Sequence, residues 1–463
     1  MYESTPKKLN ILEIILILGP VIDVLTSLSQ RKLELNISIG LIVRAFFIFF
    51  MVMYVFFRST YKYKKQSIIY LIIILLYMVL FTINIYINKG IESLLFEVKD
   101  LIKAFYFPIC IITIINYIKT INYKLNIKIF SCAILEYITL LFIPQILGLG
   151  YESYAEDKIG TIGWFFSANE ISSILGILII FVIFSYDYIK NKFLYVAVVT
   201  YSIYNIMQIG TKVPAIAACI CIICFILINF IRYIMSKNKE KIVAMTFGIS
   251  TLIIFIVIFF TSPVYKNLEI YRDYLISIRE VNDNVIQDKD VYETDEPNYI
   301  EENQNNYETE QNNKIQDYTD NKVLNEQEIA TIIHSGRAEN KDEIQAKFNN
   351  SSYKYKILGL GKVNLEEKSY YLIEIDYYDI LFNFGYLGFI TYFIPVLVLL
   401  LAILKKINLD YIKSIISDNH KCCYIIGCVN ALLLGAISGH TLVSPAVSIY
   451  IAIMLIGLYV DNK

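Results

Sequence analysis

The chain has 463 residues, of which 56% are hydrophobic and 18% are charged. A water-soluble protein of this length could not cover its surface with so few polar groups. The formal net charge of -1 at pH 7 shows no excess of positive charge, and no nucleic-acid partner is expected.

Apolar runs of about 20 residues recur along the chain, and each is long enough to cross a hydrocarbon core of roughly 30 Å. This pattern predicts an all-α polytopic membrane protein without a cleavable signal peptide. We expect about twelve transmembrane helices, at residues 9–27, 37–57, 67–88, 101–118, 127–149, 169–187, 193–210, 213–234, 242–262, 379–403, 422–438 and 441–459.

Lysine and arginine residues are concentrated in one set of the short connecting segments. With a cytoplasmic N-terminus, 19 of them fall in cytoplasmic segments and 7 in the opposite short loops. Cytoplasmic loops of membrane proteins carry such an excess. We therefore expect a multi-pass protein of the cell membrane with both termini cytoplasmic and the long polar segment after the ninth helix extracellular.

The expected organisation has three parts. Transmembrane helices 1–9 occupy residues 1–262, a large extracellular loop occupies residues 263–378, and helices 10–12 occupy residues 379–463. Within the loop, residues 280–322 contain 13 acidic residues against 3 lysines and few aliphatic residues, which predicts a disordered insertion. Apolar residues return at helical spacing afterwards, so residues 324–378 are predicted to be an ordered helical part.

Arg44 lies inside the second predicted span, toward its outer half. A charge at this depth costs at least a few kcal/mol and by default indicates a functional residue with a partner. Asp23, at the outer end of the first span, is the candidate partner. Two interpretations stay open, a structural Arg44–Asp23 pair and an Arg44 that binds an anionic substrate group.

Trp164, Asn169 and Glu170 belong to an external segment that enters the sixth span. Aromatic residues here are typical of a membrane-interface belt. Asn169 and Glu170 either bind a sugar or cap the helix.

Lys212 follows Gly210 and Thr211 in a tight outer turn, so its cation lies at the membrane interface. It either pairs with a lipid diphosphate or meets ordinary headgroups by snorkelling. Arg337 lies in the large loop at the start of a predicted helix. Its planar fork suits a diphosphate or a sugar, and the alternative is a solvated surface arginine.

Glu374, Asp376 and Asp379 stand at the outer mouth of the tenth span. Carboxylates there are candidates for a general base that takes a proton from a sugar hydroxyl, and the alternative is a helix cap. His440, in the tight outer turn before the last span, is either a structural interface residue or part of the site. His334, in the large loop, is an external alternative base.

The run Leu358-Gly359-Leu360-Gly361-Lys362 is not a nucleotide-binding loop. No Ser or Thr follows Lys362, and the expected location is outside the cell. Cys219, Cys221 and Cys224 lie in an apolar helix without acidic or histidine companions, so we interpret them as buried small residues. No metal or other cofactor is expected.

The order of these signals from Gly163 to the C-terminus resembles the O-antigen ligase and polymerase superfamily. Its members are bacterial membrane glycosyltransferases that use undecaprenyl-diphosphate-linked sugars. The resemblance is carried by Ser335-Gly336-Arg337, by Leu358-Gly359-Leu360-Gly361, and by the late span entered at Leu381 with Gly385 and Leu387-Gly388. It implies a GT-C-like fold with one large extracellular loop late in the chain.

Gly210-Thr211-Lys212 is similar to the family's interfacial Ser-Arg turn, with lysine in place of arginine. The resemblance implies catalysis without a metal. Cations such as Arg337 and Lys212 would bind the diphosphate that leaves as an acceptor hydroxyl attacks.

The histidine cluster that many family members carry before the glycine of the late span is missing here. Counting back from Gly385, Glu374 and Asp376 occupy those positions. The resemblance therefore implies that Asp376 or Glu374 replaces the histidine base, or that His334 or His440 serves instead.

The predicted function is polymerisation of undecaprenyl-diphosphate-linked oligosaccharide repeat units into a capsular, exo- or O-antigen-type polysaccharide outside the membrane. We expect the diphosphate near Lys212, Arg44 and Arg337, and the acceptor sugar beside Trp164 in the external cavity. The growing polysaccharide and the lipid bilayer are further partners, with flippase and chain-length regulator proteins as candidates. The alternatives are a ligase that transfers finished glycan, and a flippase or other transporter, which the absence of a repeat relating the two halves disfavours.

Overall fold

The computed structural model describes residues 10–34, 38–154, 158–291, 337–364, 369–371 and 373–460. Most of these residues are helical, because a chain segment in a hydrocarbon layer must satisfy its own backbone hydrogen bonds. The apolar helices are α1 (Ile11–Arg31), α2 (Ile39–Phe57), α3 (Lys64–Ile121), α4 (Lys128–Ile146), α5 (Ala168–Ile183), α6 (Lys192–Gln208), α7 (Lys212–Ser236), α8 (Lys239–Phe260), α14 (Asp376–Leu404), α16 (Asn419–Ile437) and α17 (Pro445–Val460).

The remaining elements connect these helices. Two short antiparallel hairpins pair β1 with β2, with Tyr151 opposite Gly163, and β3 with β4, with Val363 opposite Tyr370. The other elements are β1 (Tyr151–Glu152), β2 (Thr161–Gly163), the 3₁₀ helix η1 (Phe184–Asp187), α9 (Pro263–Val291), α12 (Arg337–Asn350), α13 (Tyr353–Leu358), β3 (Val363–Asn364), β4 (Ser369–Tyr370) and α15 (Leu409–Ser417).

The predicted class, an all-α polytopic membrane protein, is confirmed. Each of the twelve predicted spans overlaps a helix. Nine helices of the described part are long and apolar enough to cross a membrane. The count of nine treats α3 as a single helix. It omits α6 and α17, which have only 17 and 16 residues. The number twelve stays a prediction.

α3 contains two of the predicted spans in one element of 58 residues. Its backbone bends at Gly90, where φ is 74° and ψ is -175°, a conformation that glycine adopts without a steric penalty. The amide of Asn116 donates a hydrogen bond of 2.8 Å to the Ser67 hydroxyl, so the two ends of α3 lie side by side. The element therefore consists of two antiparallel arms.

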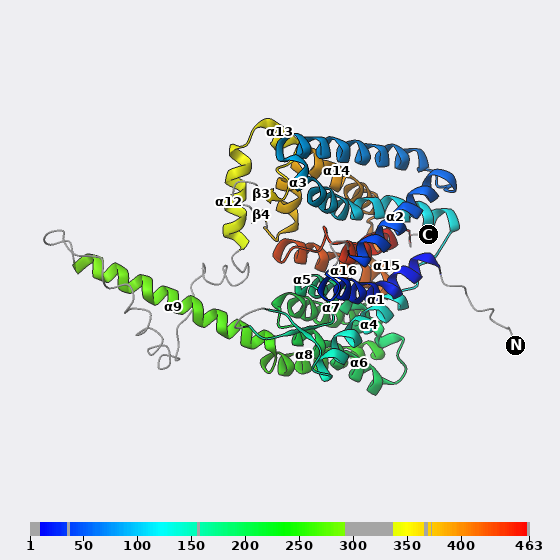
Figure 1. The fold of residues 1–463 in the computed structure, drawn as a ribbon. Coiled ribbons are helices and arrows are strands. Elements are labelled where there is room, and N and C mark those ends of the chain that lie inside the picture. Colours follow the sequence, from blue (N-terminus) through cyan, green and yellow to red (C-terminus); the bar gives the residue numbers. More distant parts are fainter. Residues whose placement is uncertain are drawn as a thin grey trace.

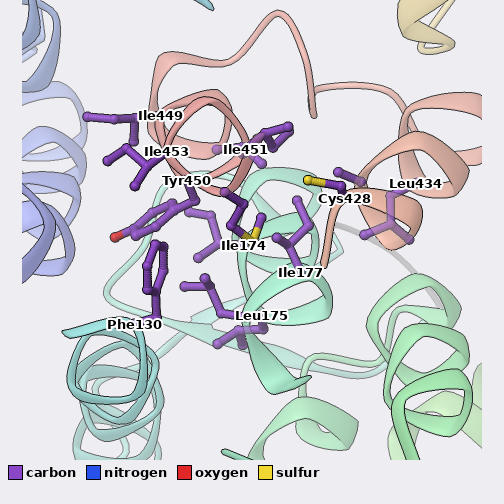
Figure 2. Packing of buried hydrophobic residues seen from close by; sticks show 14 of the residues in the cluster. Phe130, Ile174, Leu175, Ile177, Cys428, Leu434, Ile449, Tyr450, Ile451 and Ile453 are labelled. Carbon is purple, nitrogen blue, oxygen red and sulfur yellow. The ribbon is translucent and has the colours of Figure 1, made fainter. Parts of the chain in front are cut away.

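α5 and α17 form the centre of the bundle. Residues 171–183 of α5 and residues 445–458 of α17 are buried without exception. A helix that is apolar on every face is stable only when other helices surround it. Figure 2 shows Ile174 and Ile177 of α5 in the same cluster as Tyr450 and Ile453 of α17.

The two ends of the bundle differ. One end, called the site end here, gathers the carboxyl ends of α1, α4, α6, α8 and α16 and the amino ends of α2, α5, α7, α14 and α17. α9 leaves this end and extends away from the bundle, while α12 stands beside β3 and β4 (Figure 1). The opposite end, called the basic end, carries the lysine-rich turns, including Lys237–Lys241.

The segment after α8 begins with α9, which continues to Val291 and so includes residues 280–291 of the predicted insertion. The disorder of the insertion stays a prediction. Residues 292–336 lie outside the described residues. α12 and α13 fall in the part predicted to be ordered and helical.

Candidate active site

The glycine-rich turn at residues 358–361 packs against a bend of α14 at the site end. At Gly385 the helix backbone adopts φ 67° and ψ -178°, which frees the carbonyl groups before it. The Leu360 amide donates to the Phe382 carbonyl at 2.9 Å, and the Gly361 amide donates to the Asn383 carbonyl at 3.0 Å. The glycine-rich turn after α13 therefore supplies the backbone amides that bind the carbonyl groups left free where α14 bends.

The residues just after this turn are held by Glu97 of α3. Its carboxylate accepts hydrogen bonds from the amides of Lys362 and Val363, at 3.0 and 2.8 Å, and pairs with Lys89 at 2.8 Å. The Lys362 ammonium lies 3.1 Å from the Asp100 carboxylate. Burial lowers the pKa of Lys362, but Asp100, Asp379 and Asp376 together outweigh this effect and the pKa is raised, so the ammonium is charged.

Asp376 begins α14 and is completely buried. One carboxylate oxygen accepts hydrogen bonds from the amides of Thr441 and Leu442, at 2.9 and 2.6 Å. Asp376 therefore fixes the turn between α16 and α17 from inside. Asp379, three residues later in α14, is also buried.

Two loops meet beside this turn, and both carry a residue in the left-handed region. Glu374 and His440 each have φ 56°. A Cβ on Gly439 would lie 2.6 Å from the Glu374 carbonyl, so the two backbones are in direct contact. Residues with side chains are uncommon in this conformation, and such residues cluster at functional sites.

Arg337, Glu374 and His440 form a chain of charged contacts. The Arg337 guanidinium donates to one Glu374 oxygen from Nε at 3.0 Å and from Nη2 at 2.8 Å. The other oxygen lies 3.8 Å from His440 Nε2. Arg337 also donates to the Ile437 carbonyl at 3.3 Å, which ties α12 to the end of α16.

The contacts among Arg337, Glu374 and His440 set the pKa values of the Glu374 carboxyl group and the His440 imidazole. The contact with His440, followed by that with Arg337, lowers the pKa of Glu374 to about 2. Burial lowers the pKa of His440, but the carboxylates of Glu374, Asp376 and Glu170 together outweigh it and the pKa is raised above 6.5. Glu374 is therefore a stable carboxylate, and His440 is a more basic imidazole than a free one.

Arg337 lines a cavity of about 140 Å³, called the cationic cavity here. Lys212 and Lys158 supply two more cations, and Asn169 supplies an amide. None of the described residues that line it is acidic. Arg337 and Lys212, both predicted to bind a diphosphate, are thus brought to one place.

His440 lines a second cavity of about 280 Å³, called the mixed cavity here. Arg44 and Asp23 face it as an ion pair, and Tyr137 donates to Asp23 at 2.6 Å. Glu170 also lines it and accepts a hydrogen bond of 2.8 Å from the Ser444 hydroxyl. The structural interpretation of Arg44 agrees with this geometry, because its cation is already neutralised.

The other predicted residues are placed as follows. Trp164 is half-buried against the apolar core and lines neither cavity. His334 lies outside the described residues. A larger cavity of about 540 Å³ opens at the basic end around Arg232 and His420, and it contains none of the predicted site residues.

Sequence reasoning missed several residues of these cavities, among them Lys158 and the Asp100–Lys362 pair. Lys362 was considered only within a rejected nucleotide-binding loop. Asp100 and Lys103 did carry a signal, since they lie three residues apart on one helix face and both line the mixed cavity.

A sequence profile of the O-antigen ligase-like membrane proteins matches residues 6–463. The chain therefore belongs to this family, and the match includes the part before Gly163 that the motifs alone had not covered. No curated protein and no solved structure gives a match.

Proposed function

We propose that this protein transfers a glycan from a lipid diphosphate to a hydroxyl group of an acceptor, on the outer face of the membrane. The observation that carries the proposal is the contact chain from the cationic cavity through Arg337 and Glu374 to His440 at the mixed cavity. One site then holds cations for a leaving diphosphate and a carboxylate-supported imidazole for the attacking hydroxyl. Membership in the O-antigen ligase-like family supports the same reaction class.

The cationic cavity suits the diphosphate of the donor. Lys158, Lys212 and Arg337 converge on it without a lining carboxylate among the described residues. In a partly buried site such cations interact more strongly with an anion than they do in bulk water. They also stabilise the charge that develops on the diphosphate as it leaves.

His440 is the proposed base, and Glu374 positions it and raises its basicity. The hydroxyl proton passes to the imidazole while the hydroxyl oxygen bonds to the anomeric carbon of the donor sugar. The bond from that carbon to the diphosphate oxygen breaks, and its electron pair leaves with the lipid diphosphate. Asp376 and Glu374 were the first candidates from the sequence, but the buried Asp376 supports the turn and Glu374 binds Arg337.

The identity of the acceptor separates two versions of this reaction. The family description favours a ligase, in which the acceptor is a different molecule. The predicted polymerase, in which the acceptor is another lipid-linked undecaprenyl-diphosphate repeat unit, stays a prediction. Both versions use the same two cavities and the same base.

The test uses purified protein in liposomes with the lipid-linked glycan extracted from cells in which the gene is deleted. We expect new glycosidic bonds by mass spectrometry, lost in His440→Gln. His420→Gln, at the basic end, is the matched control and should be fully active. Movement of the glycan across the bilayer without a new bond would overturn the proposal and favour a transporter.

A further inference from the structure

The two cavities at the site end differ in charge. The described lining of the cationic cavity contains three cations and no carboxylate, and one of the three, Arg337, is paired with Glu374 outside that lining. The lining of the mixed cavity contains both signs in equal number, namely Asp23, Asp100 and Glu170 against Arg44, Lys103 and Lys362. The two cavities therefore suit ligands of different charge.

The charges of the mixed cavity are largely neutralised within the protein. Arg44 pairs with Asp23, and Lys362 pairs with Asp100. In this cavity the attraction of a diphosphate to the three cations is offset by its repulsion from the three carboxylates, so little net attraction remains. Arg44 is therefore a poor diphosphate ligand, although it lies at the right depth.

The same lining suits the hydroxyl groups of a sugar. Each sugar hydroxyl donates one hydrogen bond and accepts others, so it needs donors and acceptors side by side. Carboxylates and ammonium groups supply both here, and Gln30 adds an amide with both functions. Phe166 is 46% exposed and adds an aromatic ring to the lining, with the Arg31 guanidinium 5.1 Å from the centre of that ring.

The position of His440 indicates which substrate the mixed cavity binds. Its imidazole lines the mixed cavity, while Arg337, at the other end of the contact chain, lines the cationic cavity. A base must be within hydrogen-bond reach of the hydroxyl that it deprotonates. The attacking hydroxyl therefore comes from the side of the mixed cavity.

We infer that the mixed cavity is the acceptor subsite and that it takes an uncharged sugar. The inference rests on the proposed function, and it moves Arg44 from the donor diphosphate to the acceptor. Asp23 and Arg44, with Asp23 also held by the Tyr137 hydroxyl, then form a fixed polar wall that selects sugars without a phosphate or carboxylate group.

The first experiment locates the diphosphate with farnesyl diphosphate as the probe, by calorimetry on the protein in detergent. Asn169→Asp adds a negative charge to the cationic cavity and should weaken binding by about fivefold or more. Gln30→Glu adds the same charge to the mixed cavity and should leave the affinity within about twofold. Equal losses in both variants would show that the diphosphate reaches both cavities and would overturn the inference.

The second experiment measures transfer in the liposome assay. Gln30→Ala removes a sugar contact and should lower kcat/KM by about fivefold, with farnesyl diphosphate binding unchanged. Wild-type transfer rates in Gln30→Ala would overturn the inference while leaving the proposed function intact. A wild-type protein that forms no glycosidic bond would instead overturn the proposed function.

Discussion

At the scale of single residues, the site depends on a contact that joins three distant parts of the chain. Arg337 begins α12, Glu374 precedes α14, and His440 lies between α16 and α17. The carboxylate accepts from the guanidinium and faces the imidazole, so removing any one member changes the charge state or orientation of the others. Substitutions here should affect catalysis more than stability.

Arg337→Ala should lower the transfer rate by roughly 10²-fold or more, because a cation that stabilises the leaving diphosphate is lost. Arg337→Lys keeps the charge but not the fork that binds Glu374 and the Ile437 carbonyl, so it should recover only part of the rate. Initial rates in the liposome assay check both. Arg272→Ala on the exposed α9 is the control, and a comparable loss there would contradict the assignment.

The pH dependence should follow His440. A base works only when neutral, so activity should rise with pH through the raised pKa of His440, with its inflection above 6.5. Glu374→Gln removes one of the three carboxylates that raise this pKa and leaves Asp376 and Glu170, so the inflection should move part of the way to lower pH. An unchanged pH–rate profile in Glu374→Gln would show that His440 is not the titrating base.

The same pair sets a pH window for stability. The pKa of Glu374 is lowered to about 2, so its contribution is present above its ordinary value of 4.5 and is lost as the pH falls toward 2. The pKa of His440 is raised, so its contribution is present below 6.5 and is lost as the pH rises through the raised value. Thermal unfolding in detergent should therefore lose the stabilisation by this pair on both sides of that window, and Glu374→Gln should flatten the profile.

Two substitutions of Asp376 distinguish a catalytic base from a structural residue. Asp376→Ala leaves the Thr441 and Leu442 amides without their partner, at a cost of about 1–3 kcal/mol for each buried group. Asp376→Asn keeps an oxygen acceptor, so it should be more stable than the alanine variant and should retain activity. If Asp376→Asn has the stability of the wild type but no transfer activity, Asp376 and not His440 is the base.

At the scale of elements, the bend of α14 depends on the close approach of two backbones. A Cβ on Gly385 would lie 2.5 Å from both the Gly359 nitrogen and the Ile357 carbonyl oxygen. The turn after α13 and the bend therefore fit only as a pair of glycine-containing segments. The spacing of these glycines along the sequence reflects this three-dimensional contact.

Gly385→Ala should lower both the melting temperature and the transfer activity. Gly90→Ala is a matched control, because Gly90 has nearly the same φ and ψ but has nothing within 4 Å of an added Cβ. Both variants carry the backbone strain, of order 1–3 kcal/mol, but only Gly385→Ala adds a steric clash. Equal losses of stability in the two variants would show that the docked turn does not matter.

The helices were predictable because long apolar runs have few alternatives in a membrane. The contacts at their ends were not predictable to the same degree. The sequence showed that Glu374 and Asp376 are near one end, but only long-range packing places the Thr441 amide on Asp376 and His440 beside Glu374. Arg337 was found from its place at a predicted helix start in the external loop, and Lys212 from its tight interfacial turn, whereas Lys158 resembled any loop lysine.

At the scale of the whole molecule, the basic end and the site end imply an orientation. The excess of lysine and arginine at the basic end predicts that this end faces the cytoplasm and that the site faces outside. In a cysteine-free background, Tyr353→Cys should react with a membrane-impermeant thiol reagent on intact cells, since that residue is 84% exposed at the site end. Lys239→Cys at the basic end should react only after lysis, and the reverse pattern would contradict the orientation.

The central position of α17 has a consequence for the membrane insertion of the protein. Residues 445–458 are buried on all sides, and α3, α5 and α16 pack around them. Without α17 these helices would face an unfilled centre, and the turn that carries His440 would lose one of the two helices that flank it. The position of the imidazole therefore depends on the insertion of this helix.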